Sequence, residues 1–541
     1  GYTQTERAHT HTHAHMNKKD MKSVPAVPCF GAFPVAFLAL VLLFVCASSS
    51  LAQALNPGAR ATLTKDGVNH MVQRALPNVL SQLQSIPVPD QHGTASSPIG
   101  DINYNITDIV ISGLKVGALS LDLTPPSTLR VSVTGVCINV DLAWSYVDVK
   151  YPDILHDSGT ATANSSSSLF WVAASFTESQ GRPQVVVTNS NVTIGDLTII
   201  MHGGQSWLYN LIEGLFQDFL VQSMEESVEK ALVTTVNQQV AEILSTLDLD
   251  VKLDDTASVD FSMTGPPTVT SSYLSVPDKG QFYANSDHST VPGSPVSTPE
   301  ISDSNPLQFY LTSYVLASAS FVYQQAGKLD YRISQKDISS SVHLQLNTAT
   351  FKYLVPALYN KYPDQDMIIL GSCPSPPVAN ITSAGISAEF DTNMDFRVLN
   401  KDGSATSAFV ISAVAQSSGT ASVSGTSLMI KLAYLSATLK TQSSTVGPVD
   451  VSAISDIVDT LLKSVITPLL NLFISPGIPI PSVQGLELVH PEVKFSEGFL
   501  FVSTDIDYHP PSPTESHPRR DSSHRVSVLV HQHDEEFPHL H

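Results

Sequence analysis

Two long stretches, one in each half of the chain, carry apolar residues at three- and four-residue spacing, and they constrain the fold more than any other feature. The first stretch covers residues 207–244 and the second covers 454–473. A helix with such a wide apolar stripe is stable in water only when other parts of the protein cover the stripe. We therefore expect a fold that buries one long helix in each half.

Two shorter segments show the same helical periodicity. The first runs over residues 68–83, and we expect a kink at Pro77 because proline has no N–H to donate. The second includes the sequence SFVYQQAGKLDY, residues 320–331. Gly327 is typical of a helix C-terminus, so we predict that this helix ends there and that the following KLDYRIS begins a strand.

Between the helices of each half, apolar and polar residues alternate as they do in half-buried strands. We predict strands in 106–124, 127–144, 168–178, 182–201, 341–354, 384–400, 407–441 and 485–508. The chain therefore follows the order helix, strands, helix twice. This order predicts an α+β fold of two similar barrels, each a long helix wrapped by a highly twisted antiparallel sheet.

The same pattern divides the chain into segments. Residues 277–308 are rich in Pro and Ser and are interpreted as a linker, and the end of the chain shows no periodicity and is predicted to be a disordered, His- and Pro-rich tail. The predicted segments are a leader and signal peptide (1–54), an N-terminal barrel (55–276), the linker (277–308), a C-terminal barrel (309–508) and the tail (509–541).

The composition excludes several classes of protein. Of 541 residues, 42% are hydrophobic and 14% are charged, which is typical of a globular protein. The net charge of −21 argues against binding to nucleic acid, because phosphate contacts need clustered Lys and Arg. It also argues against strong attraction to anionic membranes.

The beginning of the chain predicts secretion. Lysines after Met16 precede an apolar run over 33–46, and small residues follow with cleavage sites after Ala52 or Ala54. A retained membrane anchor is the alternative, although the run is shorter than the ~20 apolar residues of a membrane span. Residues 1–15 are expected to be untranslated or removed. Glycosylation sites are predicted at Asn105, Asn164, Asn191 and Asn380.

Candidate reactive groups are sparse. The sequence has no nucleophile-elbow, zinc-protease or phosphate-loop motif, so we predict no enzyme activity, no metal and no cofactor. The alternating acids of 246–255 lack the Gly and the distal Glu of a calcium-binding loop. Cys137 and Cys373 remain after signal cleavage, and one bridge or two free thiols are both compatible with that count.

Several short motifs in the correct order resemble the family of bactericidal/permeability-increasing protein, lipopolysaccharide-binding protein and cholesteryl ester transfer protein. The resemblance covers residues 56–508. It implies an elongated boomerang of two barrels joined by a central sheet, to which the linker contributes a strand, with an apolar pocket in each barrel for phospholipid acyl chains. The motifs are Asn56-Pro57-Gly58, IPVPD (86–90), KGQFY (279–283), FVYQQAGKL (321–329), VGPVDV (446–451) and GIPIPSV (477–483).

Two departures from the family pattern affect the expectations. Members with an intradomain disulfide have cysteines where this chain has Val187 and Val228, so we expect the second helix to be held by packing alone. Endotoxin-binding members also present a Lys/Arg cluster at the N-terminal tip. The matching region, 90–123, has only Lys115 among several acids, so the phosphates of lipid A would lack charged partners.

The leading hypothesis is a secreted, non-catalytic lipid-binding or lipid-transfer protein whose partners are a phospholipid or other acyl lipid and, transiently, a membrane or lipid-particle surface. Each buried methylene contributes ~0.8 kcal/mol, so one acyl chain can supply most of the affinity. The alternatives are an innate-defence protein that binds lipopolysaccharide and a structural glycoprotein without lipid. The predicted lipid-lining residues are Val68, Met71, Val72, Leu76, Leu80, Leu211, Ile212, Leu215, Phe216, Phe219, Phe321, Val322, Ile457, Leu461 and Val465.

Overall fold

The structure is a computed structural model that describes residues 56–97, 100–203, 206–288 and 291–510, without the side chains of residues 97 and 206–216. These residues belong to one unit of the chain, Ala54–His541. The predicted leader and signal peptide, and all but the first two residues of the predicted tail, lie outside the described residues. Among the helices that are described, none is long and apolar enough to cross a membrane.

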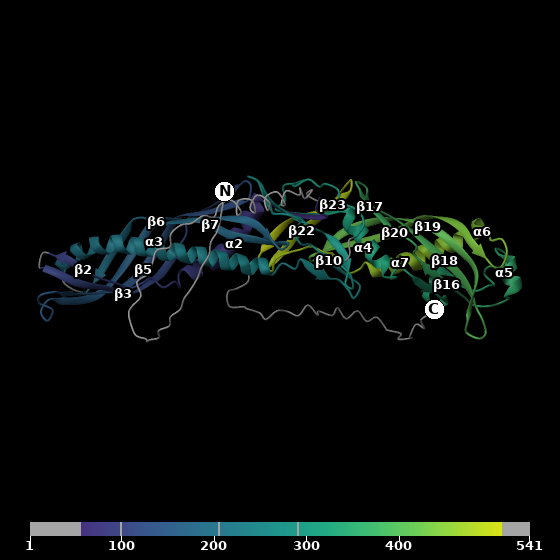
Figure 1. Ribbon diagram of the computed structural model, residues 1–541, viewed down its shortest axis with the longest axis horizontal. Coiled ribbons are helices and arrows are strands. Elements are labelled where there is room, and N and C mark those ends of the chain that lie inside the picture. The colour runs from purple at the N-terminus through teal and green to yellow at the C-terminus, as the bar shows by residue number, and fades with distance from the viewer. Residues whose placement is uncertain (1–55, 98–99, 204–205, 289–290, 511–541) are drawn as a thin grey trace, which may run out of the picture. The chain divides into compact units, whose positions relative to one another are not determined.

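The N-terminal half forms a seven-stranded antiparallel sheet (Figure 1). Its strands follow the alternation in the sequence: along β5, Ile138, Val140, Leu142 and Trp144 are buried, and the residues between them are more exposed. The hydrogen-bonded order is β2-β3-β5-β6-β7, with β4 added to β5 and β8 added to β6. The strands are β2 (Gln91–Ser97), β3 (Gly100–Lys115), β4 (Ala118–Thr124), β5 (Thr128–Asp148), β6 (His156–Ser179), β7 (Arg182–Thr193) and β8 (Leu197–His202).

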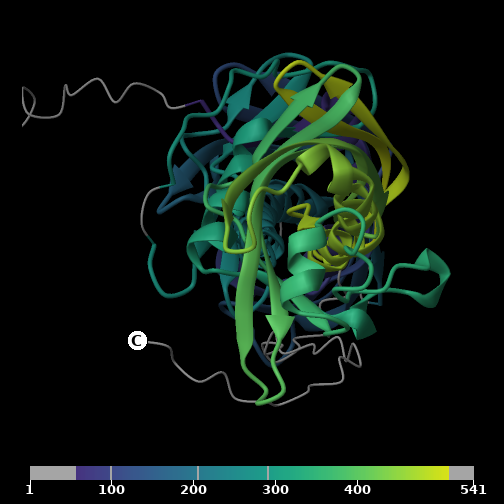
Figure 2. The ribbon, with the colours of Figure 1, turned by 90° about the vertical axis from the view of Figure 1, so that its right-hand side faces the viewer.

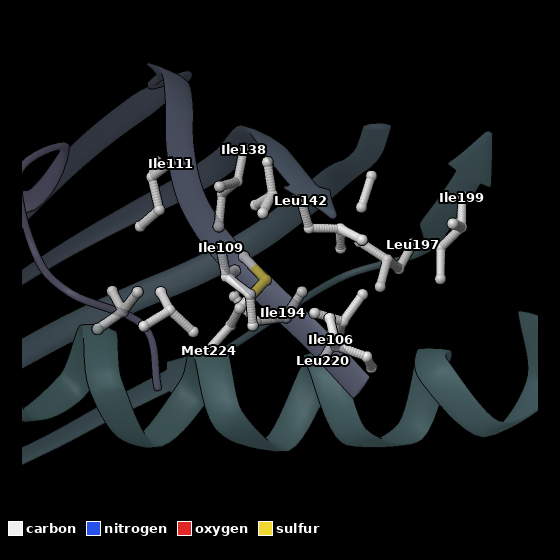
Figure 3. Close-up of a cluster of buried hydrophobic side chains, with 14 of the residues drawn as sticks. Ile106, Ile109, Ile111, Ile138, Leu142, Ile194, Leu197, Ile199, Leu220 and Met224 are labelled. Carbon is white, nitrogen blue, oxygen red and sulfur yellow. The ribbon is translucent and has the colours of Figure 1, made fainter. Parts of the chain in front are cut away.

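Two helices cover the buried face of this sheet. Helix α3 (Ser206–Ser245) is continuous over its whole length, and helix α2 (Lys65–Leu83) continues through Pro77. Leu220 and Met224 of α3 are fully buried and lie against isoleucines of β3 and β5 (Figure 3). The core of this half therefore consists largely of aliphatic side chains packed between one helix and a curled sheet.

Hydrogen bonds also hold α3 on the sheet, so the expectation that it is held by packing alone is wrong. Val187 and Val228, at the positions of the missing disulfide, are half-buried and buried. Strand β7 lies at the edge of the sheet, where backbone N–H groups lack a strand partner. Side chains of α3 accept from this edge in three bonds: Val187 N–H to Asn237 Oδ1 (3.0 Å), Ser190 Oγ to Glu229 Oε1 (2.7 Å) and Ile194 N–H to Glu225 Oε1 (2.9 Å).

The C-terminal half repeats the arrangement with a second seven-stranded sheet, in the order β15-β16-β18-β19-β20-β21 with β17 added to β18. Its long strands curl around the helices that follow them in the chain (Figures 1 and 2). The elements are helix α4 (Ser313–Gln325), β15 (Tyr331–Ile333), 3₁₀ turns Gln335–Asp337 and Ser340–Val342, α5 (Pro356–Lys361), β16 (Met367–Ser372), β17 (Val378–Thr382), β18 (Gly385–Leu399), β19 (Ala405–Ser424), β20 (Ser427–Ser444), α6 (Val451–Leu461), a π-helical turn (Leu462–Ile466), α7 (Thr467–Phe473) and β21 (Ile478–Pro479).

One predicted strand, 341–354, is wrong. This segment forms a 3₁₀ turn and further turns, in which Phe351 N–H donates to the Thr348 carbonyl and Val355 N–H to the Phe351 carbonyl. Its apolar residues still reach the core, because Leu346 and Phe351 are buried, as is Val355 immediately after the segment. Alternating apolar residues thus indicated burial correctly, but the backbone here forms turns and one isolated bridge, between Asn347 and Asp366, and not a strand of a sheet.

A third sheet joins strands from both ends of the chain, in the order β11-β12-β1-β14-β23-β22. Residues 59–64 and 499–508, which lie inside the two predicted barrel segments, form strands β1 and β23 of this sheet. With this sheet and the two helix-containing sheets, the predicted α+β fold class is confirmed. The bounds are β1 (Ala59–Thr64), β11 (Thr268–Val269), β12 (Tyr273–Asp278), β14 (Leu307–Thr312), β22 (Leu486–Ser496) and β23 (Phe499–Tyr508), and a small sheet holds β9 (Asp250–Lys252), β10 (Ala257–Asp260) and β13 (Gln281–Ala284).

The predicted linker is tied to the central sheet by polar contacts. Asp303 accepts hydrogen bonds from Lys494 Nζ and from Ser503 Oγ (2.8 Å). Arg60 donates to Thr298 Oγ1 across 3.2 Å. The linker residues that make these contacts are therefore held against the central sheet at three points.

Candidate functional site

The candidate site is an apolar cavity of about 210 Å³ beside the C-terminal sheet. Helices α4 and α7 form two of its walls, the sheet forms the third, and the small sheet of β9, β10 and β13 adjoins it. The cavity touches the core cluster that contains residues of the central sheet, because Phe282, Ile386, Leu428 and Ile478 belong to both. It therefore lies where the C-terminal half adjoins the central region.

The periodicity of each element explains which side chains line the cavity. Strand residues two apart face the same side, and helix residues three or four apart share a face. The lining residues follow these spacings: Ile386, Ala388, Phe390 and Thr392 on β18; Leu428, Ile430 and Leu432 on β20; Leu316, Ala319, Ser320 and Tyr323 on α4; and Ile466, Leu470 and Phe473 in and after the π-helical turn.

Three polar side chains in the walls are hydrogen-bonded within the protein. Tyr331 Oη and Thr392 Oγ1 lie 2.8 Å apart, and Ser320 Oγ donates to the Pro377 carbonyl at 2.8 Å. Burial raises the pKa of the Tyr331 hydroxyl above its ordinary range, so Tyr331 stays protonated. These bonds leave mainly apolar surface facing the cavity.

Of the side chains that line the cavity, the thiol of Cys373 is the most plausible nucleophile by chemical type. Burial, followed by the nearby carboxylates of Asp330 and Asp391, raises the pKa of its thiol to about 11. The thiol is therefore protonated at neutral pH and is a poor nucleophile. Neither Cys373 nor Cys137, which is exposed, forms a disulfide.

Asp254, the one charged residue of the lining, is exposed and therefore marks the mouth of the cavity. Tyr323 donates its hydroxyl to Asp254 Oδ2 at 2.9 Å, and its ring meets the Phe473 ring edge-on, with centroids 4.6 Å apart and planes at 82°. Burial, and then the hydrogen bond to Asp254, raise the pKa of Tyr323 above its ordinary range. A carboxylate and two aromatic rings thus lie together at the edge of an apolar cavity.

The sequence SFVYQQAGKLDY supplies part of this site. Gly327 follows the end of α4 with a φ of +66°, and Lys328 N–H donates to the Tyr323 carbonyl at 3.0 Å, which closes the helix as predicted. Gln324 Nε2 donates to the Cys373 carbonyl at 3.0 Å. The strand predicted to follow is β15.

The residues predicted to contact lipid in the C-terminal half are not in the lining of the cavity. Phe321 and Val322 pack in the central core cluster, on a face of α4 adjacent to the one that lines the cavity. Ile457, Leu461 and Val465 pack in the C-terminal core. Contact of these residues with lipid stays a prediction.

The predicted lipid-lining residues of the N-terminal half are distributed over two clusters. Val68 and Val72 pack with residues of β4, β11 and β12. Leu76, Leu80 and Phe219 pack against the main N-terminal core, and Met71 is half-buried. The side chains of Leu211, Ile212, Leu215 and Phe216 lie outside the described residues. A lipid contact at these positions also stays a prediction.

The predicted glycosylation sites differ in their exposure. Asn105 and Asn380 are exposed, whereas Asn164 and Asn191 are half-buried. Asn164 lies on β6, which pairs with β5 and β8 at that position. Glycosylation at the four sites stays a prediction.

Comparison with known proteins identifies the class of protein. Residues 67–247 match the model of the LBP / BPI / CETP family, N-terminal domain, and residues 251–508 match that of its C-terminal domain. The two matches follow one another and define a two-domain lipid-binding protein. The chain belongs to the LBP / BPI / CETP family, as its motifs predicted.

Individual relatives are similar over most of their length. A bactericidal permeability-increasing protein of Sebastes schlegelii is 28% identical, over 84% of this chain and 96% of the relative. A human lipopolysaccharide-binding protein is 25% identical, over 88% of this chain and 99% of the relative. The crystal structure of a lipopolysaccharide binding protein shares the fold with a TM-score of 0.61 at 21% identity, covering 84% of this chain and 99% of that one.

Proposed function

We propose that this chain is a secreted, non-catalytic protein that holds an acyl chain of a phospholipid in the cavity between α4 and α7 and carries the lipid between surfaces. The observation that supports the proposal most directly is the lining of the cavity, in which Asp254 is the one charged residue and most others are apolar. Burial of ten methylenes contributes about 8 kcal/mol before the cost of association. Such an affinity requires no covalent step and no specific polar contact.

The test is to purify the full chain from a secreting host, extract bound lipid and identify it by mass spectrometry. We expect acyl lipid in stoichiometric amount. The variant Ala388→Trp fills the cavity and should remove most of this lipid, because the indole occupies the space of the chain. Ala433→Trp is the matched control, since Ala433 is exposed on β20 next to the lining residue Leu432.

Two results would contradict the proposal. Equal lipid in Ala388→Trp and in the wild type would place the ligand elsewhere. Absence of co-purified lipid, combined with no uptake from vesicles, would favour the structural glycoprotein without lipid.

Binding of lipopolysaccharide is a second candidate function, and the name of the human relative, a lipopolysaccharide-binding protein, favours it. The charge of the corresponding region opposes it. Residues 90–123 contain Lys115 and four aspartates, Asp90, Asp101, Asp108 and Asp122, and Lys65 lies 3.5 Å from Asp122. We therefore expect weak binding to lipopolysaccharide that changes little between low and high salt, whereas tight and salt-sensitive binding would favour this second function.

A further inference from the structure

The mouth of the cavity has the chemical features of a site for a cation. Within the cavity lining no Lys, Arg or His is present, and the charged residue is Asp254. Among the described residues, no cationic side chain forms an ion pair with Asp254, since the neighbouring Lys252 pairs with Asp255 at 3.0 Å. The negative charge at the mouth is therefore not neutralised by the protein.

The Asp254 side chain is held in one position by its surroundings. Oδ1 accepts hydrogen bonds from Thr256 N–H (2.7 Å) and Ala257 N–H (2.8 Å), and Oδ2 accepts from the Tyr323 hydroxyl (2.9 Å). These bonds fix the carboxylate in the turn between β9 and β10. A positioned carboxylate binds a cation without first losing side-chain freedom.

Two aromatic rings lie beside Asp254, and we call the site formed by Asp254, Tyr323 and Phe473 the corner. The Tyr323 and Phe473 rings are both in the cavity lining and stand nearly perpendicular to each other. The faces of aromatic rings attract cations within ~6 Å, and quaternary ammonium groups are recognised by cages of such rings. This attraction favours an ammonium group over an anionic or uncharged group at the same place.

We propose that the mouth binds the cationic ammonium group of a phospholipid headgroup, between the Asp254 carboxylate and the rings of Tyr323 and Phe473. The inference rests on the proposed function, because it names the headgroup of the lipid whose acyl chain fills the cavity. The two-carbon spacer of such a headgroup lets its phosphate face solvent, away from Asp254. An anionic headgroup without an amine would meet only repulsion here.

The test offers the full chain vesicles that contain equal amounts of phosphatidylcholine and phosphatidylglycerol with identical acyl chains. Bound lipid is then quantified by mass spectrometry after the vesicles are removed. The wild type should retain about threefold to tenfold more phosphatidylcholine, the range expected for one cation–π contact and one partly exposed charge pair. Uncharged diacylglycerol, offered in a second mixture, should likewise bind less than phosphatidylcholine.

Variants assign the selectivity to the corner. Asp254→Asn keeps an Oδ1 acceptor for Thr256 N–H and Ala257 N–H, places an amide N–H where it can donate to the Tyr323 hydroxyl oxygen, and removes the charge. Total lipid should therefore be unchanged and the selectivity should fall toward one. Phe473→Leu should lower the selectivity by a smaller factor and gives a second reading if Asp254→Asn does not fold. Asp255→Asn is the matched control, because Asp255 is an exposed neighbour outside the lining, and it should leave the selectivity unchanged.

The outcomes separate this inference from the proposed function. If the wild type binds both lipids equally, or if Asp254→Asn and Phe473→Leu keep the wild-type selectivity, the headgroup site is wrong and the acyl-chain cavity stands. If no lipid of any headgroup binds, the proposed function is wrong and the headgroup site with it.

Discussion

Each of the two seven-stranded sheets covers one long apolar stretch of helix, but the two helical stretches differ. In the N-terminal half, α3 is one continuous helix of 40 residues against a largely aliphatic core. In the C-terminal half, the corresponding apolar stretch is divided into α6, a π-helical turn and α7, and its core contains the aromatic cluster of Phe351, Phe396 and Phe409. The described cavity lies beside the divided helix.

The π-helical turn explains why the division opens a cavity there. Thr467 N–H donates to the Leu462 carbonyl, five residues back, and Pro468 has no N–H to restore the regular pattern. Leu461 before the turn and Val465 within it face the core, whereas Leu469, four residues after Val465, is 45% exposed. The apolar stripe instead continues through Leu470 and Phe473, which line the cavity. A single extra residue in one turn thus redirects the end of the helix.

In both halves, an asparagine of the helix binds the backbone of a neighbouring strand. Asn237 of α3 accepts one bond from Val187 on β7. Asn471 of α7 accepts from Leu432 N–H on β20 (2.7 Å) and donates to the Leu432 carbonyl (2.8 Å). The comparison teaches that packing places the helices, whereas these amides fix their positions along the strands.

The largest expected effect comes from truncating the core of one half. Phe409→Ala removes a ring that stacks on Phe396 with centroids 4.7 Å apart and should lower the free energy of unfolding by about 3–5 kcal/mol. Hydrogen exchange followed by mass spectrometry should show faster exchange in β18 and β19 and unchanged exchange in β5 and β6. Ile138→Ala, in the N-terminal core, should give the reverse pattern. Equal acceleration in both halves would show that they unfold together.

If the two halves unfold independently, a change in the central sheet that joins them should affect a third region. Burial alone would raise the pKa of Asp303, but the hydrogen bond from Lys494, with those from Asn305 N–H and Ser503, lowers it. A carboxyl group whose pKa is lowered by folding stabilises the protein above its unfolded pKa of ~3.9, and this contribution is lost as the pH falls through the folded pKa. Asp303→Asn should therefore cost about 1–3 kcal/mol at pH 7.

The same variant should flatten the acid dependence of stability. Urea denaturation at pH 7 and at pH 3 measures it, and the difference between the two values should be smaller in Asp303→Asn than in the wild type. Because β14 and β23 pair in the central sheet, exchange should rise there first. A difference between pH 7 and pH 3 as large as that of the wild type would show that Asp303 makes no such contribution.

The sequence predicts where the helices and strands of this fold lie better than it predicts which strands pair with one another. Periodicity located α2, α3 and α4, and alternation located most strands, because burial on one face leaves a local record. The central sheet has no such record: β1 pairs with β12 and β14, which lie more than 200 residues away. The resemblance to the family implied a central sheet, and residue patterns alone did not place β1 or β23 in it.

The site was located less completely than the fold. From the helix at 313–325, which lines the candidate cavity, sequence reasoning selected Phe321 and Val322 on a face outside the lining, because a core contact and a ligand contact have the same apolar signature. For residues 454–473 we assumed regular helical spacing throughout, and periodicity does not reveal the π-helical turn at Leu462–Ile466. Ala319 and Ala388 went unnoticed because small residues mark a cavity only once their neighbours are known.

The smallest expected effect tests the two asparagines against each other. Asn471→Ala leaves both the N–H and the carbonyl of Leu432 without this partner and should lower the free energy of unfolding by about 1–3 kcal/mol. Asn237→Ala removes one bond, to Val187, and should cost about 0.5–1.5 kcal/mol. Chemical denaturation measures both costs, and hydrogen exchange should rise at β20 in the first variant and at β7 in the second. If Asn237→Ala is the more damaging of the two, the continuous helix depends on its edge contacts more than the divided one, and the number of bonds does not determine the anchoring.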